Sequence, residues 1–156
     1  MKKILVIGVG NIYRNDDAAG ILVARAIGDL RLPGVEVIEA SGEGTALMES
    51  WKDAGSVFLI DAVVSGASPG KVRRIDVWKE AVPPEYFHYS THAFSVAEGV
   101  ELSRTLGQLP ARMVIYGIEG KSFSAGVTVS SKVQKGIAEV TALLAEEIKK
   151  EAGPAL

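Results

Sequence analysis

The sequence predicts an α/β protein, a three-layer α/β/α sandwich around a mostly parallel, twisted central sheet of about five strands. Short apolar runs rich in β-branched residues recur along the chain and mostly lack alternation, which is typical of strands covered on both faces. Stretches with helical spacing lie between them. The resulting order, β-α-β-α-β, then an extra strand, then α-β-α, favours a mostly parallel sheet with helices on both sides.

The strands are predicted from runs of apolar and β-branched residues. Four apolar runs mark the main strands, and a fifth segment that mixes charged and β-branched residues is expected to add a strand at one edge. The five segments are KILVIG (3–8), VEVIEA (35–40), SVFLIDAVV (56–64), KVRRIDVW (71–78) and RMVIYGI (112–118).

Two helices are predicted from stripes of apolar side chains, and two more from their position between strands. The first stripe consists of Ala19, Val23, Ala26 and Leu30, and the second, in a lysine-ended closing helix, of Val133, Ile137, Val140, Leu144 and Ile148. The other two helices are expected from Thr45 to Lys52 and from His92 to about Leu106. The turn-rich segments 81–91 and 119–131 are long enough to be functional loops.

Composition limits the class of protein. A chain of 156 residues with 47% apolar residues predicts one domain over residues 1–156. The net charge of −2 argues against nucleic acid and anionic membrane surfaces as partners. Because cysteine is absent, any metal must bind oxygen or imidazole ligands. The first apolar run breaks at Gly8 and no segment is long enough to span a membrane, so we expect a cytoplasmic protein.

The first turn, in the segment IGVGNIYRNDDAAG (7–20), resembles a dinucleotide-binding motif but is incomplete. Gly8 and Gly10 fit the G-x-G-x-x-G pattern, whereas Tyr13 occupies the third glycine position. Asp16 and Asp17 follow, where the helix is expected to begin and where a carboxylate would repel phosphate. We therefore predict no nucleotide cofactor. Capping of that helix by Asp16, with Asp17 as an ordinary first-turn acid, is the simpler alternative and stays open.

A further acid and a histidine are expected near the same edge of the sheet. Asp61 ends the apolar run VFLI, at the carboxyl edge where ligand sites gather in open α/β sheets. His92 is expected at the start of a helix, where a neutral imidazole suited to metal binding is favoured. Structural roles remain open for both. The other histidine, His88, is assigned to loop packing or substrate contact. Two carboxylates and an imidazole would suit zinc or nickel with open coordination positions.

These segments together resemble the hydrogenase maturation proteases, which process the large subunit of nickel-iron hydrogenases. The resemblance covers nearly the whole chain. It rests on ILVIGVGNIYRNDDAAG (4–20), the Gly44–Thr45 pair, LIDAVVSGASPGKV (59–72), STHAFSVAEGVEL (90–102) and YGIEGKSFSAGVTVSSKV (116–133).

The resemblance implies both a site and a task. The metal-contacting residues of the family correspond to Asp17, Asp61 and His92, which would also be the catalytic residues of an aspartyl or metal-dependent endopeptidase. The protein would remove a C-terminal extension from the hydrogenase large-subunit precursor, and the nickel would be carried by that substrate. Whether a metal-polarised water or carbonyl takes part, or whether Asp16 or Asp17 activates water directly, is left open.

Two other functions are considered. A nickel-dependent maturation chaperone would use the same three ligands and bind the precursor without cutting it. A peptidyl-tRNA hydrolase also begins with a strand, a glycine turn and an asparagine. In that family, however, a proline-glycine pair is expected after Asn11 and a histidine before the first helix, and this chain has neither.

Overall fold

Five strands form one sheet in the order β2-β1-β3-β5-β4, in a computed structural model that describes residues 3–153. The first four in this order are parallel, and β4 runs antiparallel to β5. The strands are β1 (Ile4–Val9), β2 (Val35–Ala40), β3 (Ser56–Val63), β4 (Val72–Asp76) and β5 (Arg112–Glu119). All five predicted strands are confirmed to within two residues at each end. The ends of the predicted domain, residues 1–2 and 154–156, lie outside the described residues.

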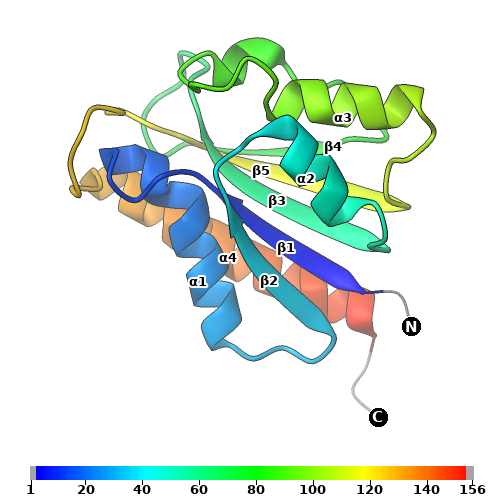
Figure 1. The fold of residues 1–156 in the computed structure, drawn as a ribbon. Coiled ribbons are helices and arrows are strands. Elements are labelled where there is room, and N and C mark those ends of the chain that lie inside the picture. The colour runs from blue at the N-terminus through cyan, green and yellow to red at the C-terminus, as the bar shows by residue number, and fades with distance from the viewer. Residues whose placement is uncertain (1–2, 154–156) are drawn as a thin grey trace.

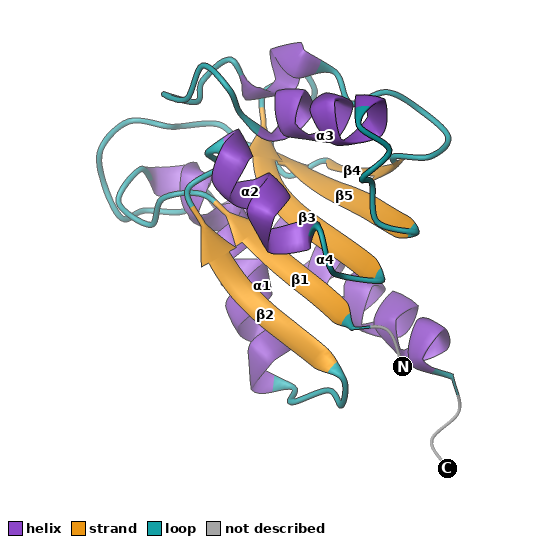
Figure 2. Ribbon diagram, turned by 45° about the vertical axis from the view of Figure 1, so that its right-hand side comes forward, coloured by secondary structure: helices purple, strands orange, loops and turns teal. Residues whose placement is uncertain are grey.

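Four α-helices cover the two faces of this sheet. They are α1 (Ala19–Asp29), α2 (Gly44–Trp51), α3 (Val96–Thr105) and α4 (Ser131–Ala152), with short 3-10 helices at Asn15–Ala18 and Pro84–Phe87. Figures 1 and 2 show α1 and α4 on one face and α2 and α3 on the other. This arrangement confirms the three-layer α/β/α sandwich. Over residues 3–153, none of the helices is long and apolar enough to cross a membrane.

The strands lack alternation of apolar and polar residues because a separate apolar core lies on each face of the sheet. In β1, Leu5 and Ile7 pack with α2 and α3, whereas Ile4 and Val6 pack with α1 and α4. Strand β3 divides in the same way, with Leu59 on the first side. Every position of a central strand therefore faces an apolar layer, as expected for a parallel sheet covered on both sides.

Two predicted helices differ from those observed. The sequence pattern places Leu30 in the buried stripe of the first helix, but Leu30 follows the end of α1 and is 49% exposed. The sequence predicts that the third helix begins at His92, whereas α3 begins at Val96. Ser95 and Glu98 explain this start, because they form a capping box in which each side chain bonds the other residue's backbone N–H. His92 therefore lies in the preceding loop.

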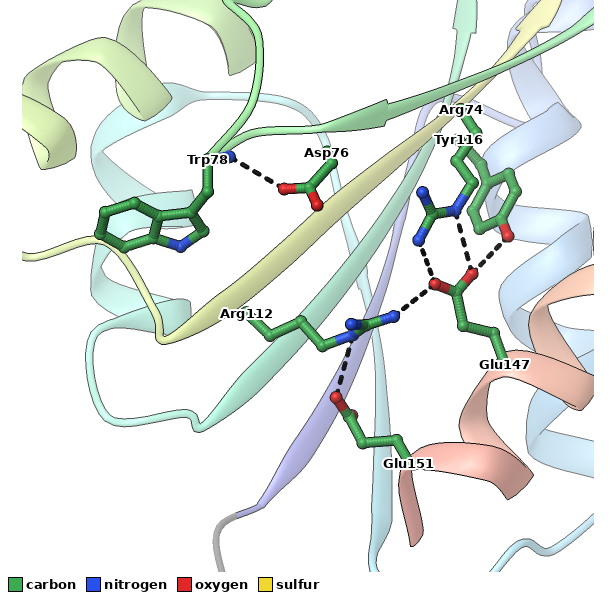
Figure 3. A network of polar contacts seen from close by, with 7 residues as sticks. All are labelled: Arg74, Asp76, Trp78, Arg112, Tyr116, Glu147 and Glu151. Carbon is green, nitrogen blue, oxygen red and sulfur yellow. Dashed lines mark hydrogen bonds and ion pairs between the residues drawn. The ribbon is translucent and has the colours of Figure 1, made fainter. Parts of the chain in front are cut away.

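A network of hydrogen bonds and ion pairs connects α4 to the sheet (Figure 3). Glu147 of α4 accepts hydrogen bonds from Arg74 of β4 and from Arg112 and Tyr116 of β5. Arg112 also pairs with Glu151, with its Nε 3.0 Å from Oε1. The side chain of Glu147 is largely buried, at 14% exposed, so these contacts compensate a carboxylate that has lost most of its water. The network fixes the C-terminal half of α4 against the antiparallel edge of the sheet.

Candidate active site

A cavity of about 290 Å³ opens at the carboxyl end of the parallel strands. It is bordered by the turn that follows β1, by Ser41 and Gly42 after β2, by Asp61 of β3 and by the loop between β4 and α3. Figure 1 shows these connections gathered at the same end of the sheet. The site therefore lies at the edge predicted from the strand pattern, where parallel α/β sheets present their ligands.

The turn after β1 holds Asp17 in a fixed position. Gly10 adopts a φ of +150°, and a Cβ there would lie 2.0 Å from the carbonyl oxygen of Asp17. The backbone N–H of Asn11 donates to that same oxygen, and the N–H of Asp17 donates to the carbonyl of Arg14. The glycine is required because the chain folds back onto its own backbone at this point.

Asp16 is a structural carboxylate and is not among the residues that line the cavity. Its Oδ2 accepts hydrogen bonds from the backbone N–H groups of Lys121 and Ser122 and from the Ser130 hydroxyl, and its Oδ1 accepts one from the Ser130 N–H. Burial opposes ionisation, but these four bonds outweigh it and lower the pKa of Asp16. The interpretation of Asp16 as a helix cap is wrong, since Ala18 occupies that position in α1. Asp16 instead ties residues 121–130 to the first turn.

Asp17 lines the cavity. It is 5% exposed, and burial raises its pKa above the ordinary value. The guanidinium of Arg14, whose Nη1 lies 4.0 Å from Oδ2 of Asp17, and the nearby phenol of Tyr89 act in the opposite direction. A carboxyl group with a raised pKa at the wall of a cavity is suited to proton transfer.

Asp61 lies within β3, one residue beyond the pairing of β3 with β1, and is 3% exposed. Burial and the nearby charge of Asp17 raise its pKa well above the ordinary value. The structural role that the sequence leaves open for Asp61 requires a partner that compensates the buried acid. Its side-chain partner is the phenol of Tyr89, whose hydroxyl lies 2.9 Å from Oδ1 of Asp61.

Tyr89 is the residue of the site that the sequence reasoning missed. Its only signal in the sequence is an aromatic residue in a long proline-led loop, between His88 and His92. Its hydroxyl is also 2.5 Å from the carbonyl oxygen of Ala62, and its ring stacks on Phe123 with centroids 4.2 Å apart. Tyr89 therefore joins the end of β3 to the loop that follows β5.

His92 borders the same cavity, on the side formed by the segment after β2. A Cβ on Gly42 would lie 4.0 Å from the ring of His92. Backbone hydrogen bonds from Ala46 and Thr45 at the start of α2 lower the pKa of Glu43, and the nearby imidazole of His92 adds a small contribution in the same direction. Ser90 accepts a hydrogen bond from the His92 N–H. His88 is exposed and does not line the cavity.

The structure thus brings the three predicted ligands to one cavity without closing them into a metal centre. Asp17 and Asp61 interact electrostatically, and His92 borders the cavity beside Gly42. Among residues 3–153, no group of three histidine, aspartate or glutamate side chains is close enough to hold a metal ion as it stands. The arrangement offers two carboxylates on one side and an imidazole carried by a loop.

Comparison with known proteins identifies the family. A family model described as hydrogenase maturation protease matches residues 22–147. The hydrogenase 2 maturation protease of Escherichia coli K12 is 27% identical over 152 residues, which cover 92% of each chain. The solution structure of an endopeptidase from Escherichia coli superposes on this chain with a TM-score of 0.80 at 25% identity, over 97% of this chain and 94% of that chain. The hydrogenase maturating endopeptidase HybD from E. coli scores 0.74 at 20% identity, over 97% and 94%.

The fold and these matches identify the class of protein, a protease built on a mostly parallel α/β sheet. The chain belongs to the hydrogenase maturation protease family. It is therefore a peptidase and acts on a protein substrate. The family match confirms the resemblance to the hydrogenase maturation proteases that the sequence motifs indicate. It also argues against the peptidyl-tRNA hydrolase alternative.

Proposed function

We propose that this peptidase removes a C-terminal extension from the nickel-loaded large-subunit precursor of a nickel-iron hydrogenase. In this proposal Asp17, Asp61 and His92 contact the nickel that the precursor presents, and so restrict cleavage to loaded precursor. The observation that carries the proposal is that all three side chains border one cavity at the carboxyl edge of the sheet.

The open arrangement of the three residues supports a metal supplied by the substrate. Two carboxylates and one imidazole form a mixed oxygen and nitrogen ligand set that suits a borderline divalent ion such as nickel. His92 lies in a loop outside regular secondary structure, and we propose that it turns toward the two acids when the precursor docks. The cation would also compensate the negative charge that burial makes unfavourable on Asp61.

Asp17 is the better candidate for the general base of peptide hydrolysis. The carboxylate of Asp16 is saturated by four donors and has a lowered pKa, so it is a poor proton acceptor. Asp17 borders the cavity and its pKa is raised, which brings it closer to the range of an effective base. We propose that Asp17 accepts the proton of the attacking water while Arg14 stays beside it.

The proposal is tested with purified protein and a hydrogenase large-subunit precursor prepared with and without nickel. Mass spectrometry should show loss of a C-terminal peptide from the nickel-loaded precursor and no change in the nickel-free one. Cleavage of both forms would contradict nickel sensing. A stable complex with intact, nickel-loaded precursor would instead support the chaperone function.

A further inference from the structure

We propose that Tyr89 is a positioning residue for Asp61, and that Phe123 in turn fixes Tyr89 from the loop after β5. This inference rests on the proposed function, because it assigns Tyr89 a part in the processing reaction of the same site. Tyr89 would not contact the scissile bond itself. It would hold the carboxyl group of Asp61 in one orientation, so that the remaining oxygen faces the cavity.

The contacts of the Tyr89 hydroxyl support this role. It lies 2.9 Å from Oδ1 of Asp61 and 2.5 Å from the carbonyl oxygen of Ala62, the next residue of the same strand. The phenol therefore bridges a side chain and the backbone of β3, and rotation of the carboxyl group about its χ angles would break the first contact. Among the described residues, the ion pairs include none to Asp61, so Tyr89 is its principal side-chain partner.

The position of the Tyr89 ring is fixed by stacking. The rings of Tyr89 and Phe123 lie 4.2 Å apart at 28°, which is offset-stacked geometry. The backbone carbonyl of Phe123 accepts a hydrogen bond from Nε of Arg14 at 3.1 Å. The loop of Phe123 is bound to the first turn by Asn15, whose side chain contacts Ser122 and Thr128.

These contacts form a continuous path from the turn after β1 to the carboxyl group of Asp61. Asp16 and Asn15 fix the loop, the loop fixes Phe123, and the ring of Phe123 fixes Tyr89. Partners that orient a ligand side chain typically change activity or metal affinity by about 10–100-fold when they are removed. The precursor is a protein that would also contact the chain outside the cavity, so a misoriented Asp61 should slow cleavage of the docked precursor more than it weakens docking.

The test is Tyr89→Phe, which removes the hydroxyl and keeps the ring that stacks on Phe123. With nickel-loaded precursor we expect kcat to fall about 10–100-fold and KM to change by less than about twofold. Tyr86→Phe is the matched control, because its phenol is also buried but bonds Arg73 and does not line the cavity. This control should retain the wild-type kcat.

A second variant, Phe123→Leu, keeps the hydroxyl of Tyr89 but removes the stacking, and should lower kcat by a factor below the about 10–100-fold expected for Tyr89→Phe. Unchanged kcat in Tyr89→Phe would overturn the inference, as would an equal loss in Tyr86→Phe. A loss confined to KM would also overturn it, since that result would make Tyr89 a substrate contact. If wild-type protein does not process the precursor at all, the proposed function itself fails, and the two failures are thereby distinguished.

Discussion

Asp16 and Asp17 are adjacent in the chain, yet their carboxyl groups have opposite surroundings. The Asp16 carboxylate receives four hydrogen bonds from the segment 121–130, whereas Asp17 borders the cavity with Arg14 at 4.0 Å. Their pKa values accordingly shift in opposite directions, down for Asp16 and up for Asp17. Asp16 holds the segment 121–130 against the first turn, and its neighbour Asp17 lines the cavity.

Asp16→Asn should destabilise the protein by about 2–4 kcal/mol. An amide cannot accept all four bonds, and its NH₂ group would face N–H donors that are then left unpaired in a buried site, at about 1–3 kcal/mol each. Urea unfolding measures the free energy of unfolding, with Asp29→Asn, an exposed acid at the end of α1, as control. Equal stability of the two variants would show that Asp16 does not anchor the loop.

The fold was predictable because its signals are local. Unalternated apolar runs identify strands covered on both faces, and the segment 71–78 marked the extra strand that the structure shows as β4, antiparallel to β5. The errors occurred at helix ends, where one or two side chains decide the boundary and an apolar pattern does not mark it. The start of α3 is set by Ser95 and Glu98, and that capping box competes with an earlier start at His92 that the spacing alone favoured.

The site was predictable only in part. Asp17, Asp61 and His92 were expected at one edge, and they border one cavity. The roles of Asp16 and Tyr89 depend on contacts between residues about 105 and 28 positions apart in the chain. No periodicity encodes such contacts, because they arise when loops from different strands meet above the sheet.

Asp61→Asn should abolish processing and raise stability at neutral pH. The folded protein raises the pKa of Asp61 well above the ordinary 3.8, so it retains a proton that the unfolded chain releases. Ionisation of Asp61 in the unfolded chain therefore lowers the free energy of unfolding of the wild-type protein as pH rises from about 4 toward the pKa of Asp61 in the folded protein. The loss is about 1.4 kcal/mol per unit of pKa shift. An asparagine has no such proton and can still accept a bond from Tyr89.

The measurement is the free energy of unfolding of both proteins between pH 4 and pH 8. The advantage of Asp61→Asn should be smallest near pH 4, grow with pH and then level off above the folded pKa. Asp53→Asn, at an exposed position after α2, should show no comparable trend. An advantage that decreases with rising pH would contradict the assignment of a raised pKa to Asp61.

Gly10→Ala should destabilise the fold by roughly 3 kcal/mol or more and eliminate processing, because its Cβ would meet the backbone oxygen of Asp17 at 2.0 Å. Gly34→Ala is the control. Gly34 also has a positive φ, +74°, but nothing lies within 4 Å of a Cβ there, so only the backbone cost of about 1–2 kcal/mol is expected. Similar losses in the two variants would mean that the close approach to Asp17 is unimportant.

His92→Ala should lower processing of the nickel-loaded precursor by at least about 100-fold, because the third ligand of the proposed site is lost. Its free energy of unfolding should change by no more than about 0.5 kcal/mol, since the side chain lies in a loop and belongs to neither core. The chain has one other histidine, His88, in the same loop but outside the cavity. His88→Ala should therefore process the precursor at the wild-type rate. Equal activity of His92→Ala and His88→Ala in the mass-spectrometric assay would remove imidazole from the mechanism and leave Asp17 and Asp61 as the only contacts of the chain with the metal.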